Sequence, residues 1–243
     1  VGMPARNLAE RTRQEYSKDL EDLIIFLSSE LGLSSVQEVG LVHLDRYQAE
    51  MDRRGYKAST RERKTYAIKT WFQFLNRQGF TTNNVAEKLT PPKQEDREPR
   101  FLSKDEYQNL LRVCSHKPRD AAIIEVLLQT GIRLSELAGL KLEGVSLPKR
   151  ITKDPDNMGS IRVLRKGGKI KTIPLNYKAC QAVAAWLRVR PKIEHSALFV
   201  SKFKRPMSKR AIQYTIAKYL NEAGIEGASV HSLRHTMATR HVA

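Results

Sequence analysis

The spacing of hydrophobic residues predicts helices over most of the first ninety residues. Between residues 8 and 31 the apolar positions recur at helical intervals and form one stripe. A second helix is predicted over residues 41–54. A third is predicted from Ser59, because Ser59 and Glu62 have the spacing of a capping box. A glycine follows each predicted helix, at Gly32, Gly55 and Gly79. We therefore expect the chain to begin with a small helical domain.

A polar, proline-rich stretch follows at residues 90–100, with the sequence TPPKQEDREPR. It contains three prolines and charges of both signs but no apolar side chain, which is typical of a linker. The sequence thus predicts a helical domain over residues 1–89, the linker, and a second domain over residues 101–243.

The second domain begins with further helix signals. Ser103 and Glu106 form another expected capping box, Pro118 suits a first helical turn, and Gly131 ends the apolar helix that follows. A short helix is expected next, around the sequence LSELAGL.

The pattern then changes between residues 160 and 175, where β-branched residues on both sides of Gly-Gly predict a hairpin. Helices return over residues 177–190 and 208–223, and residues 197–200 fit a short strand. The expected fold is mainly α with a small antiparallel β-sheet.

The charge of the chain narrows the choice of partner. Lys and Arg number 43 against 26 Asp and Glu, which gives a formal net charge of +17. Such an excess repels itself and favours a polyanionic partner, with nucleic acid first and an anionic membrane surface second. No apolar run approaches the roughly 20 residues that a membrane-spanning helix needs.

The two cysteines, Cys114 and Cys180, lie in apolar helical patterns, which favours buried thiols over a disulfide or a metal pair. That usage fits a reducing compartment, and no signal peptide is visible at the start of the sequence.

Two groups of polar residues are candidates for contacts with nucleic acid. The cations in the first turns of the third predicted helix are expected to bind phosphates, although a merely solvated face is the alternative. These cations are Arg61, Arg63, Lys64 and Lys69. A second group shares one face of the helix at residues 208–223 and is expected to contact base edges. It consists of Lys209, Arg210 and Gln213.

Three further clusters carry candidate chemistry. Arg133 stands at a glycine-broken join between two helices, with Glu136 close enough to orient its guanidinium. Lys166 lies at the hairpin turn, where Lys169 competes for the same role. His231 and Arg234 are spaced i and i+3 on one helical face.

Two arginines could hold a phosphodiester and stabilise a pentacoordinate phosphorus, because their planar forks match phosphate oxygens and stay charged. A lysine or histidine could move the proton. Each residue also has a structural alternative, such as a surface ion pair or a solvated turn.

The order of these motifs resembles the tyrosine recombinase (phage integrase) family. TGIRLSEL, the lysine hairpin RKGGKIKTIPL and HSLRHTMAT follow a basic helical domain, and the resemblance runs over nearly the whole chain. It implies a helical core-binding (SAM-like) domain followed by an α+β catalytic domain. It also implies site-specific recombination of duplex DNA through a 3′-phosphotyrosyl intermediate, without a cofactor.

By this resemblance Arg133 and Arg234 bind the scissile phosphate and Lys166 protonates the leaving 5′ oxygen. His231 assists proton transfer, while Glu136 and His235 support the site. The resemblance further implies a dimer on each DNA site, a tetramer in the synapse, and a location in the prokaryotic cytoplasm with the nucleoid.

In this family the nucleophilic tyrosine follows the motif that contains His231, whereas the last tyrosine here is Tyr219. We therefore expect the sequence to stop short of the nucleophile and to bind DNA without cleaving it. The alternative is a non-catalytic DNA-binding regulator or a dominant-negative factor. A zinc site formed by His231, His235 and His241 is disfavoured, because Arg234 would set a positive charge beside the metal.

Overall fold

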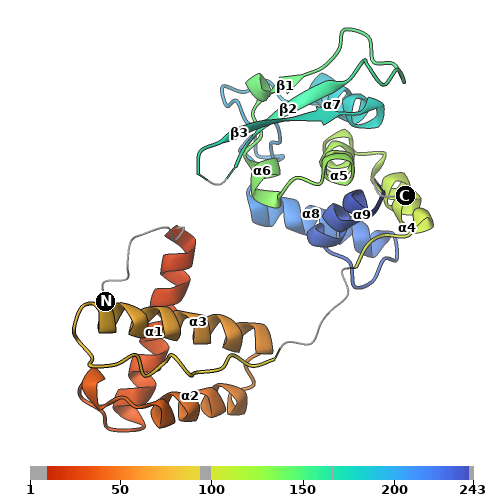
Figure 1. Cartoon of the computed structure of the whole chain (residues 1–243). Coiled ribbons are helices and arrows are strands. Elements are labelled where there is room, and N and C mark those ends of the chain that lie inside the picture. The colour runs from red at the N-terminus through yellow and green to blue at the C-terminus, as the bar shows by residue number, and fades with distance from the viewer. Residues whose placement is uncertain (1–9, 94–99, 166, 241–243) are drawn as a thin grey trace. The chain divides into compact units, whose positions relative to one another are not determined.

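The computed structural model describes residues 10–93, 100–165 and 167–240, and the chain divides into two compact units, residues 1–97 and 98–243. Helices dominate both units and the second also carries a small antiparallel sheet, as the sequence predicted (Figure 1). The domain limits drawn from the sequence, 1–89 and 101–243, are not tested by this division and stay predictions.

The first unit contains α1 (Glu10–Ser29), α2 (Leu41–Arg53) and α3 (Ala58–Arg77), with a 3₁₀ turn, η1 (Val36–Glu38), between the first two helices. Figure 1 shows α1 crossing the other two helices, and α1 contacts both of them. The buried positions follow the predicted helical stripes. They include Leu20, Leu23, Leu44, Tyr47, Met51, Ile68 and Phe72.

The start of α3 differs from the expected capping box. The helix begins at Ala58, and the carbonyl of Lys57 accepts the first helical N–H groups, from Thr60 and Arg61. Ser59 is therefore already inside the helix and cannot cap it.

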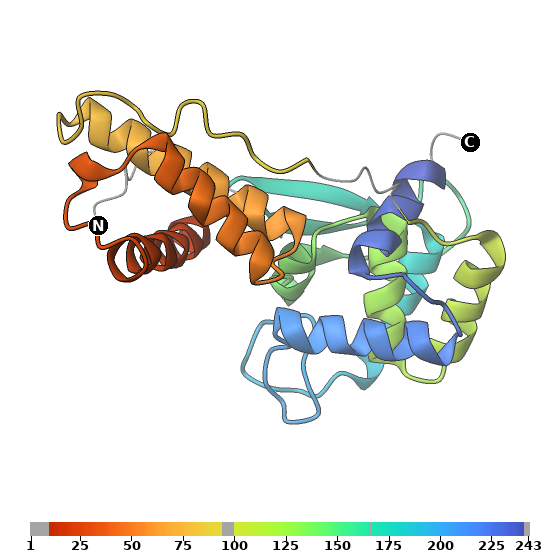
Figure 2. The same ribbon diagram turned by 90° about the horizontal axis from the view of Figure 1, so that it is seen from below.

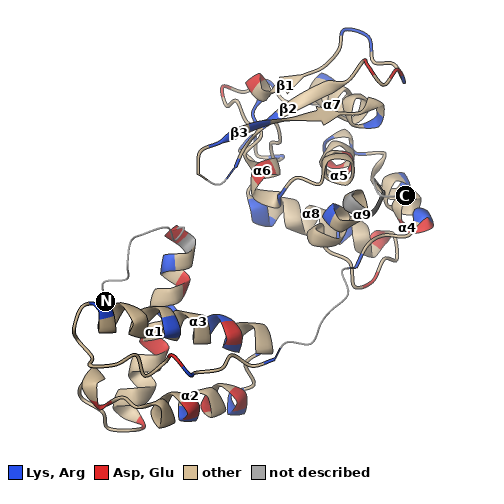
Figure 3. Ribbon diagram, viewed as in Figure 1, with Lys and Arg blue, Asp and Glu red and all other residues tan. Residues whose placement is uncertain are grey.

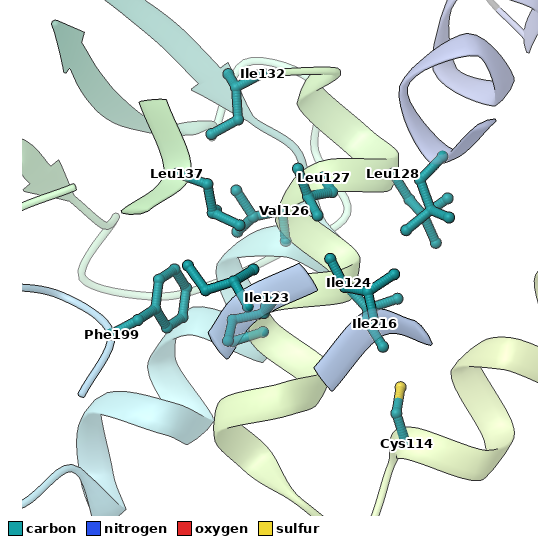
Figure 4. Packing of buried hydrophobic residues seen from close by; sticks show 14 of the residues in the cluster. Cys114, Ile123, Ile124, Val126, Leu127, Leu128, Ile132, Leu137, Phe199 and Ile216 are labelled. Atoms are coloured by element: carbon teal, nitrogen blue, oxygen red, sulfur yellow. The ribbon is translucent and has the colours of Figure 1, made fainter. Parts of the chain in front are cut away.

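The second unit is built around α5 (Pro118–Thr130), which contacts α4 (Lys104–Cys114), α7 (Tyr177–Val189), α8 (Lys209–Glu222) and α9 (Val230–Arg240). Because α5 is surrounded, its apolar residues occur on almost every side of the helix rather than in one stripe. Figure 4 shows this packing. The labelled side chains from α5 are Ile123, Ile124, Val126, Leu127 and Leu128.

The expected helix signals around α5 are confirmed. Ser103 accepts the N–H of Glu106 in a capping box, Pro118 occupies the first turn of α5, and Gly131 ends it in the left-handed conformation at φ 58°. Glycine has no Cβ and therefore adopts a positive φ at little cost, which makes it the natural residue at this position. The turn at Gly131 leads directly into α6 (Leu134–Ala138).

The predicted hairpin is present as β2 (Gly159–Leu164) and β3 (Ile170–Leu175), with Ile161 opposite Ile173. A two-residue strand that the sequence did not reveal, β1 (Val145–Ser146), completes the sheet order β1-β2-β3 after a 3₁₀ turn, η2 (Leu142–Gly144). The strand expected at residues 197–200 is reduced to isolated bridges at Ala197 and Val200. Both cysteines are buried free thiols, as predicted.

Candidate functional site

The arginine at the start of α6 is held by a carboxylate one turn along the same helix. The backbone N–H of Arg133 donates to Glu136 Oε2 at 2.8 Å, and Arg133 Nη1 donates to Glu136 Oε1 at 3.1 Å. The Glu136 side chain is only 4% exposed, whereas that of Arg133 is 59% exposed. Glu136 thus fixes one side of the guanidinium and leaves the rest of its donors towards solvent.

The second predicted arginine reaches the same place from the far end of the sequence. Arg234 lies on α9, and its Nη1 donates to the carbonyl oxygen of Gly131 at 2.6 Å. Gly131 precedes Arg133 by two residues, so the bond joins α9 to the turn that presents Arg133. The structure therefore brings Arg133, Glu136 and Arg234 to one junction between α5, α6 and α9.

Three other contacts fix α9 against the rest of the unit, beside α5 in Figure 2. The hydroxyl of Thr236 accepts the N–H of Leu102 at 2.8 Å and donates to the carbonyl of Ser232. Met237 packs against Gly131, where an added Cβ would lie 3.2 Å from its sulfur. Leu233 is completely buried. The Arg234 side chain consequently projects from a helix with little freedom to shift.

The remaining predicted residues of the site are less constrained by the structure. His231 is exposed in the first turn of α9, and its backbone N–H donates to the Ser229 hydroxyl. His235 is also exposed. Lys166 lies outside the described residues. The roles given to these three residues by the sequence stay predictions.

Arg165, which the sequence reasoning passed over, also belongs to this junction. Its Nε lies 3.8 Å from Glu136 Oε1, the oxygen that Arg133 already contacts. The signal in the sequence was its place beside Lys166, but a hairpin turn does not reveal which helix it faces.

Comparison with known proteins agrees with the order of motifs. Residues 100–242 match the phage integrase family, and residues 3–79 match the phage integrase N-terminal SAM-like domain. The chain belongs to the tyrosine recombinase (phage integrase) family. It is 33% identical over 247 residues to the tyrosine recombinase XerC of Natranaerobius thermophilus, covering 96% of this chain and 80% of that protein. It is 32% identical to XerC of Pelobacter propionicus, covering 96% of this chain and 76% of that protein.

Solved structures of recombinases share the fold. XerH bound to a palindromic difH substrate matches with a TM-score of 0.77 at 19% identity, over 97% of this chain and 70% of that one. A lambda integrase dimer bound to a COC′ core site matches with a TM-score of 0.73 at 16% identity, over 97% and 84% of the two chains.

The cations predicted to bind phosphates on α3 prove to have partners inside the first unit. Lys64 is the clearest correction: its side chain is 7% exposed, and its Nζ lies 2.7 Å from Asp22 and 3.4 Å from Asp19. The hydroxyl of Tyr47 donates to the same Asp22 carboxylate. A buried ammonium between two carboxylates is not available to a DNA backbone, so the predicted phosphate contact of Lys64 does not fit the structure.

Lys69 is likewise used internally, because its Nζ donates to the carbonyls of Glu87 and Leu89 and ties the following segment to α3. Arg61 pairs with Asp52, and Arg63 pairs with Asp19, but both guanidiniums are partly exposed. Their phosphate contacts stay predictions. Figure 3 shows basic residues on α3 and residues of both charges along α2.

The polar residues predicted on α8 remain accessible. Ser208 caps the helix by accepting the N–H of Ala211, and Lys209, Arg210 and Gln213 are exposed. Figure 3 shows the basic residues at the start of α8. Their contact with base edges is not tested by the structure and stays a prediction.

Among the described residues, no group of three histidine, cysteine or acidic side chains could hold a metal ion. No helix in the same part of the chain is long and apolar enough to cross a membrane.

Proposed function

We propose that the protein binds duplex DNA as a site-specific recombinase and holds the scissile phosphate at the junction of α5, α6 and α9. The observation that carries the proposal is the bond from Arg234 to Gly131, which ties Arg234 to the turn that presents Arg133, although the two arginines lie about a hundred residues apart in the sequence. Family membership supplies the reaction class, and the net charge of +17 suits the substrate.

The proposed chemistry follows from these side chains. Arg133 and Arg234 bind the phosphate oxygens and stabilise the second negative charge that develops as the phosphorus becomes pentacoordinate. Lys166 donates a proton to the leaving 5′ oxygen, and His231 assists proton transfer. Side-chain cations supply the positive charge, and in the reaction of this family a tyrosine forms the 3′-phosphotyrosyl bond that conserves the energy for rejoining.

The proposal also covers the assembly of the protein on DNA and its location in the cell. Similar recombinases are seen as a dimer on a core site and as a tetramer on a Holliday junction. By analogy the protein pairs on its DNA site and joins two sites in a synapse. Such an activity belongs at the nucleoid, in the prokaryotic cytoplasm.

We further propose that the polypeptide of residues 1–243 binds DNA and leaves both strands intact. Tyr219, the last tyrosine in the sequence, is 1% exposed, and its hydroxyl donates to buried Asp120 at 3.1 Å. Burial and the neighbouring Asp120 charge raise the pKa of Tyr219. A phenol held in this way is not an available nucleophile. In this form the polypeptide would act as a DNA-binding regulator or a dominant-negative partner.

A nicked suicide substrate tests both parts of the proposal. Duplexes are first selected from a random pool by the polypeptide itself, and a selected site is then nicked near the contacted phosphates. The expected result is retarded migration in a gel with no covalent adduct after denaturation. Binding should fall steeply with salt, because it rests on phosphate contacts.

Two results would contradict the proposal. A covalent adduct would show that one of the tyrosines present is a nucleophile, and mapping the adduct would identify it. If the polypeptide prefers no duplex over the others, the proposal of site-specific binding is contradicted. Arg133→Gln should weaken binding of the selected site, whereas Arg112→Gln serves as the control, because Arg112 is an exposed cation on α4.

A further inference from the structure

Arg165 occupies a fixed backbone position at the start of the hairpin turn. Its N–H donates to the carbonyl of Lys169 at 2.8 Å, and its own carbonyl accepts the N–H of Gly168 at 3.2 Å. Gly167 and Gly168 both have positive φ, which suits the tight turn between β2 and β3. The backbone therefore determines where the Arg165 side chain leaves the hairpin.

That side chain meets the carboxylate that orients Arg133. Arg165 Nε is buried, yet at 3.8 Å from Glu136 Oε1 it is too far for a hydrogen bond, and it makes none with the described residues. Arg133 Nη1 contacts the same oxygen at 3.1 Å. The two guanidinium nitrogens are consequently within about 7 Å of each other, close enough for each charge to affect the other strongly.

The net charge of the side chains at the junction matches the charge of a phosphodiester in its pentacoordinate transition state. Arg133, Arg165 and Arg234 carry three positive charges against the single negative charge of Glu136, which leaves two in excess. A phosphodiester carries one negative charge and gains a second when its phosphorus becomes pentacoordinate. Without Arg165 the excess would be a single positive charge, because Glu136 would offset the charge of Arg133 and only that of Arg234 would remain.

We propose that Arg165 is a positioning residue of the phosphate site, which shares Glu136 with Arg133 and so leaves the charge of Arg133 available to the scissile phosphate. The proposal rests on the proposed function of this junction and goes beyond it, because it assigns a third arginine. When a phosphate draws Arg133 Nη1 away, Arg165 Nε is the donor that can close on Glu136 Oε1. The orphaned Nε–H then gains an acceptor, and Glu136 keeps a partner.

Ethylation interference tests this assignment at single phosphates. A selected duplex is ethylated at random, and the loss of binding is measured for each neutralised phosphate with the wild-type polypeptide of residues 1–243. Arg133→Gln and Arg234→Gln should both abolish the interference at one common phosphate. Arg165→Gln should reduce interference at that phosphate about fivefold and leave other phosphates unchanged, because the lost charge acts only nearby.

Two comparisons separate positioning from folding. Arg165→Lys keeps the charge and should restore most of the interference at that phosphate. Arg162→Gln is the matched control, because Arg162 lies on β2, three residues before Arg165, but donates to the carbonyl of Glu143, away from Glu136. It should give the wild-type pattern. A general loss of structure would lower binding at every phosphate rather than at one.

The outcomes distinguish the two proposals. If Arg133→Gln and Arg234→Gln share no phosphate, the proposed function of the junction fails. If they share one and Arg165→Gln keeps full interference there, or acts at another phosphate, the assignment of Arg165 alone is overturned. If Arg165→Gln does not fold, Arg165→Lys decides: an interference pattern that has lost more than half of the common peak contradicts a role based on charge.

Discussion

Replacing Lys64 by methionine should destabilise the first unit while leaving the phosphate contacts of the protein unchanged. The ammonium is 7% exposed and lies between Asp22 at 2.7 Å and Asp19 at 3.4 Å. Breaking a buried ion pair costs about 3–5 kcal/mol, because the partner charge stays behind without compensation. Here both carboxylates keep other donors: Arg63 for Asp19, and Arg54 and Tyr47 for Asp22. We therefore expect a loss of about 2–3 kcal/mol.

Tryptophan fluorescence can follow this unit by itself. Trp71 is 8% exposed in the core of the first unit, and the other tryptophan, Trp186, lies in the second. In a Trp186→Phe background, urea unfolding reports on Trp71 alone. Arg77→Met is the matched control, because Arg77 is an exposed cation on the same helix. It should change the free energy of unfolding by no more than about 0.5 kcal/mol.

Acid sensitivity gives an independent check of the same network. Burial alone would raise the pKa of Asp22, but hydrogen bonds from Lys64 and Tyr47 outweigh it and hold the pKa below its usual range. A lowered folded-state pKa contributes stability that is complete above the unfolded value near 3.9 and is lost as the pH falls below it. Lys64→Met should reduce this loss of stability at low pH, because the pKa of Asp22 would then be lowered less by the fold.

DNA binding separates the two roles of Lys64. If Lys64 contacted a phosphate, its removal would reduce the magnitude of the slope of log affinity against log salt concentration by about one. With the unit kept folded below its urea midpoint, Lys64→Met should leave that slope unchanged. A slope lowered by about one, with wild-type stability, would refute the internal role of Lys64.

Three further results are expected. Gly159→Ala should cost about 2 kcal/mol in urea unfolding, because the new Cβ would lie 2.8 Å from the Ser146 carbonyl oxygen, which is backbone; wild-type stability would contradict this close packing. Gly131→Ala should cost about 1 kcal/mol through its positive φ, since the nearest atom is the flexible Met237 sulfur; a stabilised variant would mean that φ is not left-handed there. Cys114 and Cys180 should resist a thiol reagent in the folded protein and react after unfolding, because both are buried and burial raises the pKa of Cys114 to about 12; rapid reaction of the native protein would place a thiol at the surface.

Local sequence signals predicted the elements of this fold well, because their causes are local. The capping box at Ser103, the proline at the start of α5 and the left-handed Gly131 each depend on a few neighbouring residues. The short strand β1 escaped prediction, since two residues carry no period and pair only through the hairpin. The expected strand at residues 197–200 failed for the related reason that apolar composition does not guarantee a partner strand.

Charge was the least reliable guide to contacts. The cations of α3 resembled a phosphate-binding cluster, yet Lys64 and Lys69 bind carboxylates and carbonyls within their own unit. The acidic partners, Asp19 and Asp22, lie over forty residues earlier on another helix, and no spacing in the sequence connects them to Lys64. A strongly basic composition raises the expectation for every cation equally, so only burial and pairing can show which ones are already used.

The same reasoning explains why the arginines of the proposed site differ from those lysines. Arg133 is oriented by Glu136, but its side chain remains 59% exposed. Arg234 donates one N–H to the carbonyl of Gly131 and keeps its other donors. A guanidinium has five N–H donors, so an internal bond can fix its position without exhausting its capacity for a ligand. An ammonium enclosed by two carboxylates has no such reserve. Lys64 is thus enclosed within the first unit, whereas Arg133 and Arg234 are held in place and keep donors for a ligand. Arg165, another oriented and partly exposed guanidinium, resembles these two arginines.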